Sequence, residues 1–233
     1  MRQIIAMGGG GFSMEPDNLL LDQYVLTQVD SASPKVCFIP TASGDADSYI
    51  DRFYTSFRSL PCEPSHLSLF EPAFQDLEPF VLSQDILYVG GGNTRNMLVL
   101  WREWGLDRIL RKAYEQGIVL TGLSAGSICW FQEGLTDPLH APLYKLNALG
   151  FIPGSHCPHY DGEEMRRPSY QRLIGEGNMQ AGYGVDDGAA LHFINEALHL
   201  TVSSREQASA YYVERTTAGV EESKIAVRYL GAQ

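Results

Sequence analysis

The stretch "TGLSAGSICW" (121–130) decides the fold, because it sets a serine between glycines directly after the apolar run "GIVL" (117–120). Its centre, "GLSAG" (122–126), matches Gly-x-Ser-x-Gly, in which small neighbours let the backbone turn sharply from a strand into a helix. The apolar segment that follows is compatible with a helix start. The pattern predicts a strand, a tight turn that exposes Ser124 as a nucleophile, and a helix. The alternative is a glycine-rich turn whose serine only caps a helix.

The rest of the chain alternates short apolar runs with longer amphipathic patterns. We expect strands at 3–7, 35–40, 66–70, 85–90 and 118–122, and helices at 18–29, 46–60 and 107–114. This alternation predicts an α/β fold with a mostly parallel sheet covered by helices on both faces, because parallel strands need crossover connections. After Gly182 short strand-like runs follow each other through brief polar breaks, which predicts a β-rich C-terminal part. We expect one domain, 1–233.

The composition of the chain excludes several classes of protein function. The chain has 28 Asp and Glu against 17 Lys and Arg, for a net charge of −11, which gives no basic field for nucleic acid. Its four cysteines are widely spaced, and it contains no secretory leader pattern and no apolar stretch long enough to cross a membrane. No metal-ligand spacing occurs either. We therefore expect a cytoplasmic, cofactor-free hydrolase without nucleic-acid or membrane partners, as a monomer or homodimer.

A catalytic serine needs a base, and the segment "SHCPHYDG" (155–162) contains two histidines. Loops that follow strands gather over the carboxyl end of a parallel sheet, where Ser124 is also expected. We favour His159 over His156, because Pro158 fixes the backbone immediately before it.

The base in turn needs a carboxylate that orients its ring. Asp137 in "LTDPL" (135–139) lies in an expected turn after the helix that Ser124 begins, and Glu133 lies nearer the end of that helix. We place Asp137 first and Glu133 second. Asp161 is a weaker third candidate, because it is so near His159 in sequence.

The loop "YVGGGNT" (88–94) follows another apolar strand and supplies three consecutive glycines. Glycines let a backbone N–H approach a ligand closely, as an oxyanion hole requires. The alternative is a phosphate-binding loop. Neither the Gly-Lys-Ser/Thr ending nor the Gly-x-Gly-x-x-Gly spacing of such loops is present here.

Four segments in order, "VGGGNT" (89–94), "GLSAGSICWF" (122–131), "TDP" (136–138) and "PGSHCPHYDG" (153–162), resemble the peptidase E family of serine peptidases, the aspartyl dipeptidases and their relatives. The resemblance covers most of the chain. It implies a flavodoxin-like three-layer sandwich similar to class I glutamine amidotransferases, with serine in place of their cysteine. It also implies hydrolysis of the first peptide bond of short peptides.

Residue by residue, the resemblance makes Ser124 the nucleophile and His159 the base, with the backbone N–H groups of Gly92 and Ala125 as oxyanion donors. The acid that aligns best with the family is Asp137. Glu133 stays open as the alternative, because some relatives look like they use glutamate as the acid.

Specificity is the least determined part. A preference for N-terminal aspartate implies a cationic partner, for which Arg166 and Arg167 are candidates by bidentate pairing. Asn93 is a further substrate-binding candidate. These arginines follow acidic residues at 161–164 and can simply pair with them, and together with 186–187 those acids can instead bind a substrate's α-amino group. In that case residues other than aspartate are accepted.

Two rival functions remain. An α/β-hydrolase esterase shares the Gly-x-Ser-x-Gly pattern, but its histidine lies near the end of the chain, whereas 35 positions separate Ser124 from His159 here. A non-catalytic protein on a related α/β fold is the second rival, since fold does not imply activity. A glutamine amidotransferase is disfavoured because Cys129 lies beyond the turn.

Overall fold

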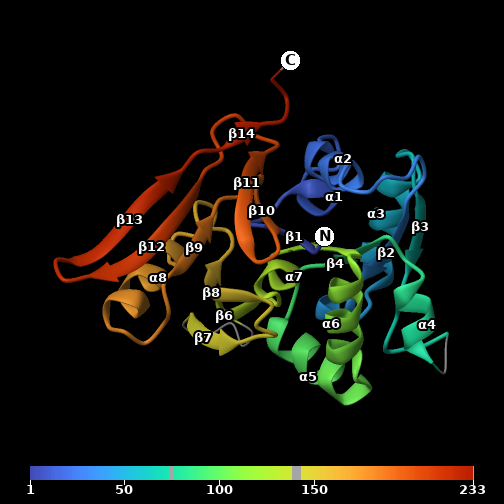
Figure 1. The fold of residues 1–233 in the computed structure, drawn as a ribbon, viewed down its shortest axis with the longest axis horizontal. Coiled ribbons are helices and arrows are strands. Elements are labelled where there is room, and N and C mark those ends of the chain that lie inside the picture. Colours follow the sequence, from blue (N-terminus) through green and yellow to red (C-terminus); the bar gives the residue numbers. More distant parts are fainter. Residues whose placement is uncertain (74–75, 138–142, 233) are drawn as a thin grey trace.

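The computed structural model describes residues 1–73, 76–137 and 143–232. Among these residues, the larger of two sheets has the strand order β14-β11-β10-β1-β5-β4-β2-β3 (Figure 1). Neighbouring strands from β1 to β3 in this order are parallel, and β10 is antiparallel to β1. The bounds are β1 Gln3–Met7, β2 Lys35–Ile39, β3 Glu63–His66, β4 Ile86–Val89, β5 Val119–Leu123, β10 Ala189–Ile194, β11 Ala197–Ser203 and β14 Arg228–Tyr229.

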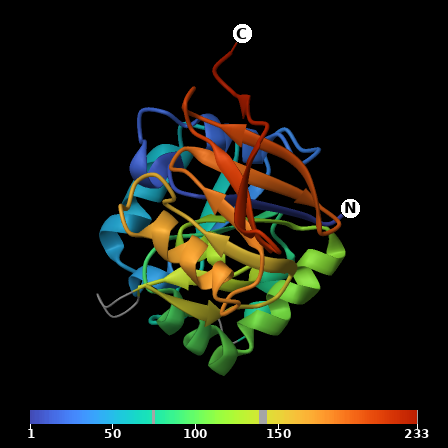
Figure 2. The ribbon, with the colours of Figure 1, turned by 90° about the vertical axis from the view of Figure 1, so that its left-hand side faces the viewer.

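The second sheet was not expected from the sequence as a separate layer. Its order is β13-β12-β9-β8-β6-β7, with β6, β8 and β9 parallel and the outer strands antiparallel to their neighbours. In Figure 1 the β12–β13 hairpin extends away from the helices of the first sheet, and in Figure 2 this side of the molecule faces the viewer. The bounds are β6 Phe131–Thr136, β7 Tyr144–Asn147, β8 Ile152–Cys157, β9 Gly182–Val185, β12 Ala210–Thr216 and β13 Gly219–Ile225.

Helices cover both faces of the first sheet. Alternate residues of β1 enter two different core clusters, one packed against α1 to α3 and the other against α4 to α6. This is the three-layer arrangement predicted from the alternating pattern. The helices are α1 Gly11–Met14, α2 Leu20–Leu26, η1 Thr41–Ser43, α3 Asp47–Phe57, α4 Leu77–Leu82, α5 Thr94–Trp104, α6 Leu106–Gln116, α7 Ala125–Ile128 and α8 Arg166–Gly175. None of those in the described ranges combines the length and apolar character needed to cross a bilayer.

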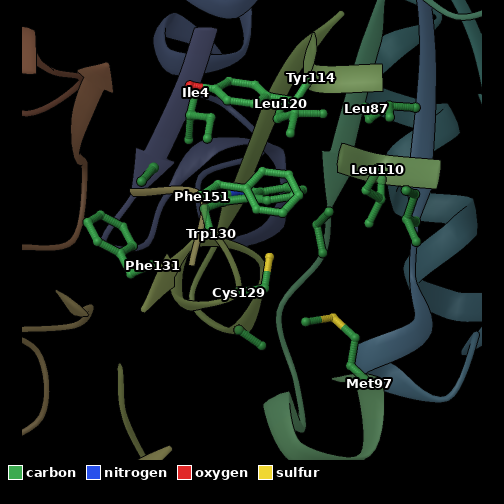
Figure 3. Packing of buried hydrophobic residues seen from close by; sticks show 14 of the residues in the cluster. Ile4, Leu87, Met97, Leu110, Tyr114, Leu120, Cys129, Trp130, Phe131 and Phe151 are labelled. Atoms are coloured by element: carbon green, nitrogen blue, oxygen red, sulfur yellow. The ribbon is translucent and has the colours of Figure 1, made fainter. Parts of the chain in front are cut away.

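The larger core cluster anchors the chain just beyond Ser124. Trp130 and Phe131 are fully buried, and Trp130 packs against Phe151 with ring centroids 5.6 Å apart (Figure 3). Burying a large side chain stabilises a fold by about 1.5–3 kcal/mol. These two aromatics therefore fix both the helix after Ser124 and the start of the second sheet.

The helix after Ser124 is shorter than the sequence predicted. α7 ends at Ile128, and β6 begins at Phe131. The reason is strand pairing: from Phe131 onward the backbone pairs with β8 on one side and with β7 on the other. Glu133 is consequently a strand residue and not a residue near a helix end.

A buried carboxyl lies in the opposite layer, beneath the loop that follows β1. Asp22 on α2 is inaccessible to solvent, and the hydroxyl of Tyr88 donates to its Oδ1 at 3.0 Å. Its Oδ2 has no hydrogen-bond partner among the described residues. Burial raises the pKa of Asp22 to about 7. A carboxyl with that pKa keeps its proton in the folded state at mildly acidic pH.

We expect Asp22→Asn to stabilise the protein at pH 8 and to have little effect near pH 4. Because the pKa of Asp22 is raised from 3.8 to about 7 on folding, the folded state binds the proton more tightly, and the free energy of unfolding falls as pH rises between these values. The gain at pH 8 should reach a few kcal/mol. Denaturant titrations at both pH values measure it, with the exposed Asp17→Asn as the matched control. An equal effect at the two pH values would contradict the assignment.

Candidate active site

Ser124 stands at the turn between β5 and α7 with φ 54° and ψ −117°, a conformation that L-residues rarely adopt. The flanking glycines make this turn possible. A Cβ on Gly122 would lie 2.5 Å from Gly126 O, and a Cβ on Gly126 would overlap the carbonyl of Val89. Such a backbone costs about 1–3 kcal/mol and persists only where its surroundings enforce it. The Gly-x-Ser-x-Gly pattern is therefore used as a strained strand-to-helix turn.

Three parallel strands end beside this serine. Leu123 pairs with Met7 of β1, and Gly122 pairs with Val89 of β4. The glycine loops that follow β1 and β4 consequently flank Ser124 at the carboxyl edge of the sheet. A Cβ on Gly91 would lie 3.4 Å from the Cβ of Ser124.

At this edge the backbone N–H groups of Gly92 and Ala125 make no hydrogen bond to the described part of the chain. The neighbours of Gly92 are engaged: Gly91 N donates to the Tyr49 hydroxyl at 3.1 Å, and Asn93 N donates to a backbone carbonyl at 2.7 Å. Gly92 has φ 137°, and a Cβ there would overlap the carbonyl of residue 42. The loop thus presents a backbone donor that only glycine can supply.

Asn93 caps α5. Its Oδ1 accepts from the backbone N–H of Asn96 at 2.9 Å, which is the usual role of asparagine at a helix N-terminus. The predicted substrate-binding residue therefore has a structural role in the same loop.

His159 follows β8 with φ 52° and reaches a carboxylate of the next crossover. Its Nδ1 lies 2.6 Å from Asp187 Oδ1, and both side chains are largely buried. Burial alone would raise the pKa of Asp187, but the hydrogen bond from His159 and electrostatic attraction between the two side chains hold that pKa below its ordinary value. Asp187 is thus an acceptor-only carboxylate, and His159 carries its proton on Nδ1. Its Nε2 is left as a base.

The chain passes from the second sheet to the first at 186–188, between β9 and β10. Here Asp187 bridges to Gly9, and Gly188 N donates to Gly9 O at 3.0 Å. A Cβ on Gly9 would overlap Asp187 Oδ1 and lie 2.9 Å from the His159 ring. Because β1 neighbours β5, the loop that carries Gly9 lies about one strand spacing, roughly 4.8 Å, from the segment that carries Ser124. The histidine–aspartate pair therefore lies against the loop after β1, and β1 is the neighbour of the strand that ends at Ser124.

The prediction of Asp137 or Glu133 as the partner of His159 is wrong. Asp137 Oδ1 lies 3.7 Å from the guanidinium of Arg166. Glu133 accepts from Lys145 Nζ at 3.2 Å and from a backbone N–H at 2.9 Å. The carboxylate on His159 follows the histidine in sequence, in "VDDG" (185–188). The sequence signal that could have identified this carboxylate is the pair of adjacent acids, Asp186 and Asp187, followed by a glycine between two strand-like runs.

The two arginines expected to bind substrate carboxylate have protein partners. Arg166 is buried and donates to Glu163 through Nε at 2.7 Å and to Leu135 O through Nη1 at 2.9 Å. Arg167 pairs with Glu222. The alternative reading, in which these arginines pair with nearby acids, describes Arg166 correctly.

His156, the histidine not favoured as base, lies inside β8 and is fully buried. Its Nε2 is 2.9 Å from Ser127 Oγ and its Nδ1 is 3.2 Å from Tyr183 O. Burial lowers the pKa of His156 to about 3. It is a neutral imidazole without access to solvent.

Within the described ranges, no group of three or more His, Cys, Asp or Glu side chains has an arrangement that could hold a metal ion. The groups gathered at this edge are a hydroxyl, an imidazole–carboxylate pair and two backbone donors. This is the set that acyl transfer by a serine nucleophile requires.

Residues 4–201 match the family model described as Peptidase family S51. The chain belongs to this family. Membership identifies it as a serine-type peptidase, a hydrolase. The chain is also 60% identical over 231 residues to the uncharacterized peptidase YgaJ of Bacillus subtilis (strain 168), covering 99% of this chain and 100% of that protein.

Solved structures confirm the fold of this S51 peptidase. A putative peptidase E protein from Listeria monocytogenes EGD-e aligns with a TM-score of 0.58 at 16% identity, over 97% of this chain and 100% of that one. A peptidase from an acI-B1 Actinobacterium aligns with a TM-score of 0.68 at 15% identity, over 97% and 95% of the two chains. The predicted α/β sandwich with a strand-rich C-terminal part is thus shared with peptidase structures.

We expect Asp187→Asn to lower kcat by about 10³–10⁴, because asparagine cannot hold His159 in the same tautomer or stabilise its cation. Asp137→Asn and Glu133→Gln are matched controls that remove one nearby carboxylate each and should change kcat by less than about threefold. Steady-state kinetics of the three folded variants on one peptide substrate decides between the acids. A large loss in a control with full activity in Asp187→Asn would reverse the assignment.

Proposed function

We propose that this S51 peptidase is an exopeptidase that hydrolyses the first peptide bond of short peptides through Ser124, His159 and Asp187. The observation that carries the proposal is the 2.6 Å contact between His159 and Asp187, which lies against the loop next to the strained turn of Ser124. A base held by a carboxylate beside a serine on a tight turn supports nucleophilic catalysis.

The proposed mechanism has two halves. Ser124 Oγ gives its proton to His159 Nε2 and attacks the carbonyl carbon, and the oxyanion accepts hydrogen bonds from Gly92 N and Ala125 N. The tetrahedral intermediate collapses, the departing amine takes the proton from His159, and an acyl-enzyme remains. Water, deprotonated by the same imidazole, then releases the acid and restores Ser124. Asp187 stabilises the imidazolium in both halves.

Substrate recognition is proposed to rest on the free amino group. Exposed Asp161 adjoins the proposed catalytic pair, since its Oδ1 accepts from Asp187 N at 2.8 Å. Negative charge here suits the ammonium group at a peptide's N-terminus. Arg166 and Arg167 already pair with protein acids, so we propose that cleavage is not confined to N-terminal aspartate.

The decisive experiment compares wild type with Ser124→Ala on X–Leu dipeptides, Asp–Leu among them, and on aminoacyl-p-nitroanilides. We expect the wild type to cleave several substrates and the variant to lose activity by on the order of 10⁵–10⁶. Labelling of wild type by a fluorophosphonate, absent in Ser124→Ala, should agree. Cleavage of Asp–Leu alone would restore the aspartyl preference, and equal activity in both proteins would remove Ser124 from the mechanism. Cleavage only of simple esters would favour the esterase alternative.

We expect Asp161→Asn to raise KM about tenfold for dipeptides while kcat changes by less than about threefold, because asparagine keeps the acceptor for Asp187 N but removes the charge that attracts the ammonium group. N-acetylated dipeptides, which lack that charge, measure the same interaction from the substrate side. If wild type cleaves acetylated and free peptides equally well, the amino group is not recognised.

A further inference from the structure

The carbonyl of Ser124 is held by three donors. Ser127 N lies 3.0 Å from Ser124 O, Ile128 N lies 2.9 Å from it, and Ser127 Oγ lies 2.8 Å from it. Two of these are ordinary helix bonds of α7. The third is a side-chain bond that the Gly-x-Ser-x-Gly turn does not itself require.

This carbonyl belongs to the same peptide unit as the proposed oxyanion donor. No cis peptide bond occurs in the described chain, so the C=O of Ser124 and the N–H of Ala125 point in opposite directions from one rigid plane. Fixing Ser124 O therefore fixes the direction of the Ala125 N–H. Because Ser124 has a strained backbone, this plane depends on such contacts more than a relaxed peptide would.

Behind the Ser127 hydroxyl stands His156. Its Nε2 is 2.9 Å from Ser127 Oγ, and its ring stacks on Phe131 with centroids 4.7 Å apart at an interplanar angle of 15°. β8, which carries His156, is paired on both sides, with β6 and β9. The imidazole is thus held between fixed strands and cannot turn away from the serine.

The positions of the protons decide which group donates in the contact between His156 and Ser127. A separation of 2.8 Å between Ser127 Oγ and Ser124 O is that of an O–H···O hydrogen bond, so the only hydroxyl proton lies between these oxygens. We assign the hydroxyl proton to this bond, so that Ser127 accepts from His156 and the imidazole proton lies on Nε2. This assignment leaves His156 Nδ1 without a proton, 3.2 Å from Tyr183 O, whereas the other tautomer would donate a hydrogen bond to that carbonyl.

We propose that His156 and Ser127 are positioning residues for catalysis, which hold the peptide between Ser124 and Ala125 so that its N–H faces the developing oxyanion. The proposal rests on the proposed function. Its chain of hydrogen bonds runs from the imidazole to the hydroxyl and then to the carbonyl.

The test is Ser127→Ala, with Ser155→Ala as its matched control. Ser155 is also fully buried, but it lies on β8, and its hydroxyl contacts Tyr170 Oη and Gln180 O at 2.7 and 2.6 Å and not the turn at Ser124. Complete loss of an oxyanion donor costs about 10²–10³ in kcat, so a donor that is only loosened should cost about tenfold, with KM within about twofold. Ser155→Ala should change melting temperature without this change in kcat.

A second pair of variants keeps the test open if Ser127→Ala fails to fold. His156→Gln retains a side-chain N–H that can reach Ser127, whereas His156→Leu does not, so activity should be higher in the former at matched stability. The effect of Ser127→Ala should also be much smaller in the His156→Leu background than in wild type. Nitrogen-15 NMR of wild type should show the His156 proton on Nε2 at pH 7.

The outcomes separate the two proposals. If wild type cleaves peptides and Ser124→Ala does not, but Ser127→Ala behaves like Ser155→Ala, or raises only KM, the positioning role is overturned and the proposed function stands. An Nδ1–H tautomer of His156 would overturn it in the same way. If wild type shows neither cleavage nor serine labelling, the proposed function fails and the positioning role fails with it.

Discussion

The candidate active site depends on one contact between the two sheets. Where the chain crosses from the second sheet to the first, at 186–188, its backbone is hydrogen-bonded to the loop after β1. Gly8 N donates to Ala189 O and Gly188 N donates to Gly9 O, both at 3.0 Å. A side chain on residue 8 would overlap the backbone at Val185, and one on residue 9 would overlap Asp187. The two glycines let the sheets meet at backbone distance. Without that approach Asp187 and His159 could not lie against the loop after β1, the strand next to the one that ends at Ser124.

Much of the first sheet could be predicted from the sequence, because doubly covered parallel strands are almost wholly apolar and easy to recognise. The turn at Ser124 and the glycine loop before Asn93 could also be predicted, because each is a short run of small residues directly after an apolar strand. The acid was not. Its identity depends on which crossover passes behind His159. That is a property of the second sheet, whose strand β6 begins at Phe131, where the sequence pattern predicts a helix. The extent of one domain over 1–233 stays a prediction.

The pairing of Arg166 and Arg167 with protein acids explains why they do not form the expected pocket for a substrate carboxylate. A guanidinium that is buried must be paired, because an unpaired buried charge is costly. Arg166 has that pairing in Glu163 and in the carbonyl of Leu135, so it ties α8 to β6. The exposed charge next to the catalytic pair is instead negative, at Asp161. Recognition of a cationic end of the substrate fits this distribution better than recognition of an anionic side chain.

Both proposed oxyanion donors are backbone groups held from behind by side chains or carbonyls that never touch substrate. Gly92 is fixed because the N–H groups on either side of it are engaged, one by the Tyr49 hydroxyl. Ala125 is fixed through the carbonyl of its own peptide unit, by Ser127. Donors oriented before the substrate arrives need no reorganisation when charge develops, which is why such preorganisation lowers the barrier. The strain at Ser124 and the buried histidine behind Ser127 are then two parts of one arrangement: the first turns the peptide toward the site, and the second keeps it there.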